Sequence, residues 1–436
     1  MSEVSKTPTV TTEEIFSRLD AVEDLPLELI MNARVLVCGA GALGNEVIKC
    51  LSLSGVGELF LVDFDIVEPS NLTRSVLFRE EDGRINRSKV EAAKRTALEI
   101  NHNPNKKIHT YMGNIADLGR GIYQRMDLIL CTTDSRASRI LVNRIAMETG
   151  SLWVDGGFQF LNPWGGAVTV YNAADLQQPC YTCSMTSQRV METLDEAKGL
   201  SCARMGRARE NAGFLPSTPT IASIIGGMQV QEGFKAMAAI KQGNIDPETS
   251  MMGQQLLVDS REHSFRKVQK QLRPQHCYEH QSPVRISDVQ QFPEWSSSMT
   301  VGALVEGLKS HLETDNVRIA MPFPIVFRRQ CLDCRNEDWV DPCMSAYTFT
   351  YKARKGFFTC NSCGSHDMVP AGSFDEIDSD ERLYTWSRDK TLADVGFRPL
   401  DILRVLYYNP EPKSAWIELT GDEASVFGLS STETEG

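Results

Sequence analysis

The sequence has no apolar run long enough to cross a bilayer. The longest candidate, residues 221–230, is about half of the roughly 20 residues that a spanning helix needs. It is also interrupted by Gly226 and Gly227. The chain begins with a polar, acid-containing stretch instead of an apolar leader segment. These absences favour a cytoplasmic protein without a membrane partner.

An excess of basic residues is missing as well. The chain has 45 Lys and Arg against 57 Asp and Glu, a formal net charge of −12 at pH 7. This balance argues against nucleic acid as a partner, because phosphate backbones attract basic surfaces. Hydrophobic residues make up 42 % of the chain, and 436 residues are enough for two or three domains with ordinary cores.

The twelve cysteines are expected to be metal ligands and thiols rather than disulfides, since a chain without a leader is expected in a reducing compartment. Two CxxC pairs stand near the C-terminal end: Cys331, Cys334, Cys360 and Cys363. Residues 347–358 between the pairs are rich in strand-forming types, so we predict a zinc ribbon. Four cysteines close the coordination shell of a structural zinc.

A nucleotide-binding pattern begins at residue 34. The apolar run 34–38 leads into a glycine turn, we predict a helix beginning at Ala42, and the apolar run 59–62 ends at Asp63. The turn contains Gly39, Gly41 and Gly44. Strand, glycine turn, helix, strand and acid form the dinucleotide-binding fingerprint, in which free N–H groups at the helix start face phosphate.

The residues after this fingerprint are more specific than the glycines. Residues 63–74 read DFDIVEPSNLTR, and Lys89 follows. Here the chain resembles the ubiquitin-activating and ThiF/MoeB-type adenylating enzymes, over about residues 12–283. In that family the run and the later lysine hold ATP, not a nicotinamide dinucleotide. The resemblance implies an α/β, Rossmann-like adenylation domain and disfavours a dehydrogenase.

The resemblance also implies roles for single residues. Adenylation needs cations on the phosphates and a carboxylate for the metal. Asp63 would bind the ribose hydroxyls, Asp65 would bind the ribose or support its neighbours, and Asp134 would bind Mg²⁺. Three residues would bind the triphosphate: Asn71, Arg74 and Lys89.

Two further catalytic roles depend on the resemblance. Arg18 matches a short motif whose arginine reaches the ATP site of the partner subunit, which implies a single-chain homodimer of the bacterial type. A solvated helix arginine is the alternative. Cys202 lies in the segment expected to be the crossover loop, residues 192–214, where a family cysteine takes the acyl group as a thioester. Nearby arginines would favour its thiolate, and an incidental cysteine is the alternative.

A second zinc site is expected in the same domain. Cys180 and Cys183 form one pair of metal ligands, and Cys277 and His280 are a plausible second pair. The family has a structural zinc held by two CxxC pairs in similar places. The histidine is a departure from that pattern, and His276 remains a rival for the fourth position.

Two smaller units are expected beyond the adenylation domain. Residues 284–371 would contain the zinc ribbon, and residues 383–428 would form a small α+β module that resembles a ubiquitin-like fold. Residues 1–11 and 429–436 are expected to be disordered. In the activating enzymes an appended module of this kind recruits the conjugating enzyme, whereas sulfur-carrier activators lack one.

Together the patterns predict an ATP-dependent enzyme that adenylates the C-terminal glycine of a ubiquitin-like protein. It would then form a thioester on Cys202 and transfer the acyl group to a conjugating enzyme, using ATP, Mg²⁺ and Zn²⁺. One alternative is a sulfur-carrier-protein adenylyltransferase of the thiamine or molybdopterin type. The other is a non-catalytic adaptor with the same fold.

Overall fold

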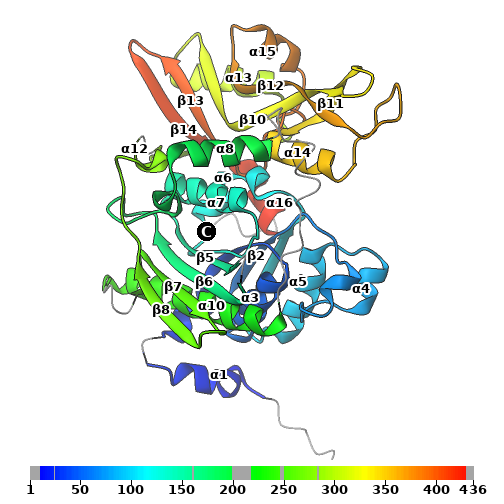
Figure 1. Cartoon of the computed structure of the whole chain (residues 1–436). Helices are drawn as coiled ribbons and strands as arrows, with labels where there is room; N and C mark the ends of the chain where they lie inside the picture. Colours follow the sequence, from blue (N-terminus) through cyan, green and yellow to red (C-terminus); the bar gives the residue numbers. More distant parts are fainter. Residues whose placement is uncertain are drawn as a thin grey trace, which may run out of the picture.

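Two β-sheets, of eight and six strands, organise the part of the chain that the structure describes (Figure 1). The computed structural model describes residues 10–23, 25–159, 162–198, 218–245, 250–281 and 284–428. Residues 10–281, the N-terminal unit, contain the larger sheet, and residues 284–428, the C-terminal unit, contain the smaller one. None of the described helices is long and apolar enough to cross a membrane.

The larger sheet has the strand order β3-β2-β1-β4-β5-β6-β7-β8. The pairs from β3 to β5 are parallel, and the pairs from β5 to β8 are antiparallel. Its strands are β1 (Arg34–Cys38), β2 (Glu58–Val62), β3 (Lys107–Tyr111), β4 (Leu128–Cys131), β5 (Leu152–Gln159), β6 (Asn162–Asn172), β7 (Gln254–Asp259) and β8 (Ser264–Gln269). The expected Rossmann-like α/β fold is confirmed.

Helices cover both faces of this sheet. Alternate residues of one strand enter different cores: Val35 and Val37 pack with α3, α5 and α10, whereas Leu36 and Cys38 pack with α6, α7 and α8. The helices of the unit are α1 (Thr12–Asp20), α2 (Leu27–Asn32), α3 (Ala42–Leu53), α4 (Glu80–Arg84), α5 (Lys89–Ile100), α6 (Arg120–Gln124), α7 (Arg136–Thr149), α8 (Ser187–Lys198), α10 (Pro219–Gln242) and α12 (Tyr278–Gln281). Short 3₁₀ turns are η1 (Pro69–Asn71), η2 (Ile115–Asp117) and η3 (Tyr181–Ser184).

Glycine is required at two places, one in the turn after β1 and one in the first turn of α3. Gly39 has φ +104°, a conformation that side chains oppose. A Cβ on Gly44 would lie 2.1 Å from the carbonyl oxygen of Gly39, so the turn can close only around glycine. The helix begins at Ala42, as predicted.

The smaller sheet has the order β11-β10-β13-β14-β9, and β12 also pairs with β10. Its elements are β9 (Gln290–Gln291), α13 (Val301–Leu312), β10 (Val317–Cys331), β11 (Glu337–Ser345), α14 (Ala346–Arg354), β12 (Met368–Asp378), α15 (Arg382–Ser387), β13 (Ile402–Tyr408), β14 (Pro412–Glu418), η4 (Thr420–Asp422) and α16 (Glu423–Phe427). The stretches 284–371 and 383–428 therefore share one sheet, and they also share one hydrophobic core.

Residues 347–358 do not form the strands that their composition suggested. Residues 346–354 are the helix α14 instead, with Ser345 as its N-cap accepting a hydrogen bond from the backbone N–H of Thr348 at 3.2 Å. Tyr347 and Phe349 are buried in two different cores, and this tertiary packing overrides their preference for strands.

The two units pack firmly against each other. Four residues of the C-terminal unit enter the core on the α6–α8 face of the larger sheet: Phe323, Tyr347, Leu400 and Phe427. At the same boundary the Arg125 guanidinium bonds the carboxylates of Glu418 and, at 2.8 Å, Glu423. Glu418 is 1 % exposed, so loss of Arg125 would leave a buried acid without its cationic partner.

Asp401 is a buried carboxyl near this boundary, 5 % exposed, that accepts a hydrogen bond from the backbone N–H of Arg398 at 2.7 Å. Burial raises its pKa from 3.8 to about 6, although Arg120 acts in the opposite direction. A carboxyl with a raised folded-state pKa binds its proton more tightly when folded. Its contribution to stability is therefore fully present below pH 4 and is lost as the pH rises through 6.

The free energy of unfolding of the wild type should fall between pH 4.5 and pH 7.5 as Asp401 loses its proton. We predict that in Asp401→Asn this fall is smaller by about 2 kcal/mol. Asparagine keeps an acceptor for Arg398 but carries no charge to be buried. Urea unfolding of both proteins at the two pH values measures the difference. Equal losses in the two proteins would contradict the prediction.

Candidate nucleotide and metal sites

The candidate nucleotide site lies where the strand order of the larger sheet reverses. β1 pairs with β2 on one side and with β4 on the other, so the chain departs in opposite directions from this point. The glycine turn follows β1, Asp63 follows β2, and Asp134 lies beyond β4, where its side chain is exposed. Such crevices at the carboxyl ends of parallel strands are the usual ligand sites of open α/β sheets.

Asp63 ties the glycine turn to the end of β2. Its Oδ2 accepts a hydrogen bond from the backbone N–H of Ala40 at 2.7 Å, and its Oδ1 accepts one from Asp65 at 2.8 Å. Burial raises the pKa of Asp63, against the opposing effect of Lys89 and the two backbone donors. The carboxyl group is thus fixed in place next to the start of α3.

Lys89 completes a compact group with the two acids, which we call the nucleotide cluster (Asp63, Asp65 and Lys89). Its Nζ lies 2.9 Å from Oδ2 of Asp65, and its backbone N–H donates to the Asp65 carbonyl at 3.0 Å. Burial lowers the pKa of Lys89, but Asp63 and Asp65 together raise it by more. The pKa of Lys89 is therefore above its usual value, and the ammonium stays charged. The structure therefore unites three of the expected site residues.

The other expected phosphate ligands lie on the intervening segment. Asn71 ends η1, and its Oδ1 accepts a hydrogen bond from the backbone N–H of Glu68 at 3.0 Å. Arg74 is half-buried and donates to the carbonyl oxygen of Ser70 at 3.0 Å. Both side chains are held locally.

Arg18 lies elsewhere. It is exposed on α1, and Phe16 of the same helix packs against Gly55, between the end of α3 and the start of β2. Gly55 precedes the amino end of β2, whereas the nucleotide cluster follows its carboxyl end. Helix α1 lies at the bottom of the molecule in Figure 1. Within one chain, Arg18 is therefore not part of the cluster.

Sequence reasoning missed Asn45, which is fully buried in α3. Its amide nitrogen donates to the carbonyl oxygens of Ala40 at 2.8 Å and Gly41 at 3.0 Å, and its oxygen accepts from the backbone N–H of Leu77 at 2.9 Å. It thereby joins the glycine turn to the segment after Arg74. The available signal was a polar residue on the apolar face of the helix.

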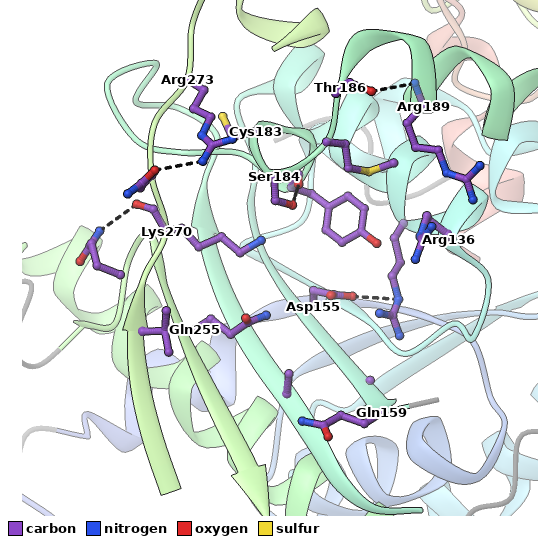
Figure 2. A pocket seen from close by; sticks show the side chains of 18 of the residues that line it. Arg136, Asp155, Gln159, Cys183, Ser184, Thr186, Arg189, Gln255, Lys270 and Arg273 are labelled. Carbon is purple, nitrogen blue, oxygen red and sulfur yellow. Dashed lines mark hydrogen bonds and ion pairs between the residues drawn. The ribbon is translucent and has the colours of Figure 1, made fainter. Parts of the chain in front are cut away.

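A basic pocket of about 700 Å³ is lined by residues of β5, α7 and α8 and by the residues after β8 (Figure 2). Its lining includes five cationic side chains and one acid: Arg136, Arg139, Arg189, Lys270, Arg273 and Asp155. Asp155 on β5 lies 3.3 Å from Nε of Arg139, and burial raises the pKa of this carboxyl. Arg136 begins α7 two residues after Asp134, so the pocket adjoins the crevice.

The first cysteine cluster brings together Cys180, Cys183, Cys277 and His280. Neighbouring sulfur and Nδ1 atoms lie 3.3–3.9 Å apart, for example 3.3 Å between His280 and Cys277 and 3.9 Å between Cys180 and Cys183. Four ligands at zinc bond lengths define a tetrahedron with edges of about 3.3–3.8 Å, so the donor set fits zinc. His276 is not part of the group.

The second cysteine cluster consists of Cys331, Cys334, Cys360 and Cys363. The sulfurs of Cys331 and Cys363 lie 3.6 Å apart, and those of Cys334 and Cys360 lie 3.5 Å apart. Four thiolates at these separations also fit a tetrahedral zinc.

Cys202 lies outside the described residues. Residues 192–198 of the expected crossover loop belong to helix α8, and residues 199–217 are not described. The structure therefore does not place the expected thioester cysteine.

The family of the chain follows from the comparison with known sequences. The family model described as "ThiF family" matches residues 16–279, and the chain belongs to this family of ThiF/MoeB-type adenylating enzymes. The match covers the unit that contains the glycine turn, the nucleotide cluster and the basic pocket. The family is one of adenylating enzymes, so adenylyl transfer is the chemistry that its members share.

Individual relatives cover only part of the chain. It is 30 % identical over 277 residues to "Adenylyltransferase and sulfurtransferase MOCS3" of Dictyostelium discoideum, covering 63 % of this chain and 58 % of that protein. It is 27 % identical over 259 residues to "Ubiquitin-like modifier-activating enzyme 5" of the same organism, covering 56 % and 62 %. The crystal structure of E. coli MccB with MccA-N7isoASN is similar with a TM-score of 0.47 and 20 % identity, covering 63 % of this chain and 76 % of that one.

We predict that His280→Ala reduces the zinc content of the purified protein from about two ions per chain to about one, because three cysteines alone hold the metal weakly. The matched control is His276→Ala, which should keep both ions. Metal analysis by mass spectrometry measures the content. Retention of both ions in His280→Ala together with loss of one in His276→Ala would reverse the assignment.

Proposed function

We propose that the protein activates a ubiquitin-like protein in two steps. First it adenylates the C-terminal glycine of this carrier protein with ATP, and then it takes the acyl group as a thioester on Cys202 for transfer to a conjugating enzyme. The observation that carries the adenylation step is the nucleotide cluster at the strand-order reversal, which is hydrogen-bonded to the glycine turn. The basic pocket supports it, because its lining includes Arg136, two residues after Asp134.

The charges of the cluster fit the first step. A carboxylate oxygen of the carrier attacks the α-phosphorus of ATP, the bond to the bridging oxygen breaks, and pyrophosphate leaves. Lys89, Arg74 and Asn71 would bind the phosphates, and the N-terminus of α3 would add backbone donors. Asp63 would accept hydrogen bonds from the ribose hydroxyls. Asp134 would hold Mg²⁺, which neutralises phosphate charge when bound.

The basic pocket fits the carrier's tail. A peptide that ends in a glycine carboxylate brings one negative charge and no side chain at its end. The pocket offers guanidinium groups from α7 and α8 and the Lys270 ammonium, against the single acid Asp155. Burial lowers the pKa of Lys270, which lies 5.7 Å from the ring centre of Tyr181. Pairing with an anionic tail would offset this cost.

The second step needs a nucleophile near the acyl-adenylate. Cys202 stands four residues after the end of α8, the helix that contributes Arg189 to the pocket wall. Attack of its thiolate on the acyl carbon would release AMP and leave the thioester. The C-terminal unit would recruit the conjugating enzyme.

Arg18 would act in the partner subunit of a homodimer. Arg18 lies on α1, near the amino end of β2 and away from the nucleotide cluster of its own chain. This position is compatible with binding to the nucleotide site of a second chain. The phosphates of that chain's ATP would be its target.

A second candidate is a sulfur-carrier-protein adenylyltransferase, which stops at the adenylate. The names of several relatives favour it, since they are adenylyltransferases and sulfurtransferases. The C-terminal unit favours the conjugation pathway, because it offers a second surface for a protein partner. A non-catalytic adaptor is disfavoured by the intact nucleotide cluster.

We predict that Lys89→Ala abolishes carrier-dependent ATP–pyrophosphate exchange, with a loss of at least about 100-fold, because it removes a charge needed at the α-phosphate. Lys94→Ala, on the same helix, should keep the wild-type rate and controls for changes in α5. Exchange at the wild-type rate in Lys89→Ala would overturn the ATP-site assignment.

Cys202→Ser should keep pyrophosphate exchange, since chemistry at phosphorus needs no thiol. It should lose the adduct with the carrier that reducing agents cleave, which a non-reducing gel detects. Cys50→Ser, a half-buried cysteine outside both clusters, should keep the adduct. If the wild type forms no adduct, the sulfur-carrier candidate replaces the thioester pathway, and an adduct that survives Cys202→Ser would place it on another cysteine.

A further inference from the structure

The helix between the two pairs of the second cysteine cluster reaches the nucleotide cluster. The hydroxyl of Tyr351 on α14 donates a hydrogen bond to Oδ1 of Asp65 at 3.1 Å, and the other oxygen of Asp65 accepts from Lys89 at 2.9 Å. The Tyr351 ring lies 4.1 Å from the ring of Phe64, the residue between the two acids. This contact joins residues 286 positions apart and lies outside the part of the chain that the family model matches.

One face of α14 is directed to the N-terminal unit. Thr348, one turn before Tyr351, bonds the carboxylate of Asp117, and Arg354, one turn after it, donates to the carbonyl oxygen of Glu196 at 2.9 Å. Glu196 belongs to the last turn of α8, the helix that precedes the segment with Cys202. The helix thus contacts both the nucleotide cluster and the approach to the proposed nucleophile.

The opposite face of α14 is held by the cysteine cluster. Phe349 and Ala353 are buried in a core that also contains Cys331 and Cys360, and the Phe349 ring stacks on Phe358 at 4.8 Å. A metal in this cluster would fix the base on which the helix rests. The helix therefore connects the core around the cysteine cluster with Asp65.

The hydroxyl of Tyr351 has a defined chemical task at Asp65. Burial and the Asp65 carboxylate raise the pKa of the phenol above its usual range, so it stays protonated and acts as the donor. When Lys89 turns toward a phosphate, Asp65 loses its cation next to a polyanion. The Tyr351 hydroxyl would still donate a hydrogen bond to the Asp65 carboxylate. This bond would limit the free-energy cost of leaving that carboxylate without a cation beside the phosphates.

We propose that Tyr351 is a positioning residue of the nucleotide site, through which α14 links the second cysteine cluster to ATP binding. The proposal rests on the proposed function of the cluster as an ATP site. It assigns the C-terminal unit a part in the first step of the reaction, in addition to any recruitment of a partner.

Tyr351→Phe removes the hydroxyl and keeps the ring against Phe64. We expect its dissociation constant for a non-hydrolysable ATP analogue to rise about tenfold, the usual effect of losing one hydrogen bond to a charged group. The matched control is Tyr347→Phe, the same change one turn earlier on α14, where the hydroxyl is buried away from the cluster. Its affinity should stay within about twofold of the wild type, and both variants should keep two zinc ions.

A double-mutant cycle separates positioning from a general effect on the fold. In an Asp65→Asn background, Tyr351→Phe should change the affinity for the analogue by less than about twofold, since its partner carboxylate is already gone. A purely structural role would cost the same in both backgrounds. Equal affinity of Tyr351→Phe and wild type, or full additivity in the cycle, overturns the proposal, whereas a wild type that binds no ATP analogue overturns the proposed function itself.

The link to the metal is tested by Cys363→Ser, with Cys343→Ser, a buried cysteine outside the cluster, as its control. Cys363→Ser should lose one zinc and weaken binding of the ATP analogue by about the same factor as Tyr351→Phe. Combining the two changes should add little. Unchanged affinity after verified loss of the zinc would show that α14 holds Tyr351 without the cluster.

Discussion

The double hydrogen bond from the backbone to the Asp63 carboxylate is the constraint on which the site depends. Because one oxygen holds Ala40 and the other holds Asp65, a single side chain fixes the glycine turn, the start of α3 and the second acid. Lys89 is positioned by its ion pair with Asp65, and Tyr351, 286 residues further along the chain, donates a hydrogen bond to the Asp65 carboxylate as well. Removal of Asp63 would therefore release several elements at once.

The parts that could be predicted from the sequence were those that local chemistry decides. The turn after β1 needs glycine at fixed positions, and strand alternation and helical spacing reveal the two covered faces of the larger sheet. The second cysteine cluster was predictable because CxxC spacing is itself the geometry of two zinc ligands. His280 was identified as a possible ligand, but only proximity in space separates it from His276.

The remainder depends on contacts between distant segments. Residues 347–354 have strand-forming aromatics, yet they form a helix because two different cores take up its two sides. The basic pocket combines side chains from α7, β5, α8 and the residues after β8, and no sequence window contains them together. Asn45 gave a weak signal that becomes meaningful only with Leu77 beside it.

The shared sheet of the C-terminal unit bears on how the chain can be dissected. β10 is fifteen residues long and pairs with β13 near its beginning and with β12 along most of its length. A truncation near residue 380 would remove β13 and β14, expose the core side of β10 and leave β9 without its neighbour. Loss of activity in such a fragment would result from the collapse of the smaller sheet. Point substitutions are therefore the better way to separate the roles of the C-terminal unit.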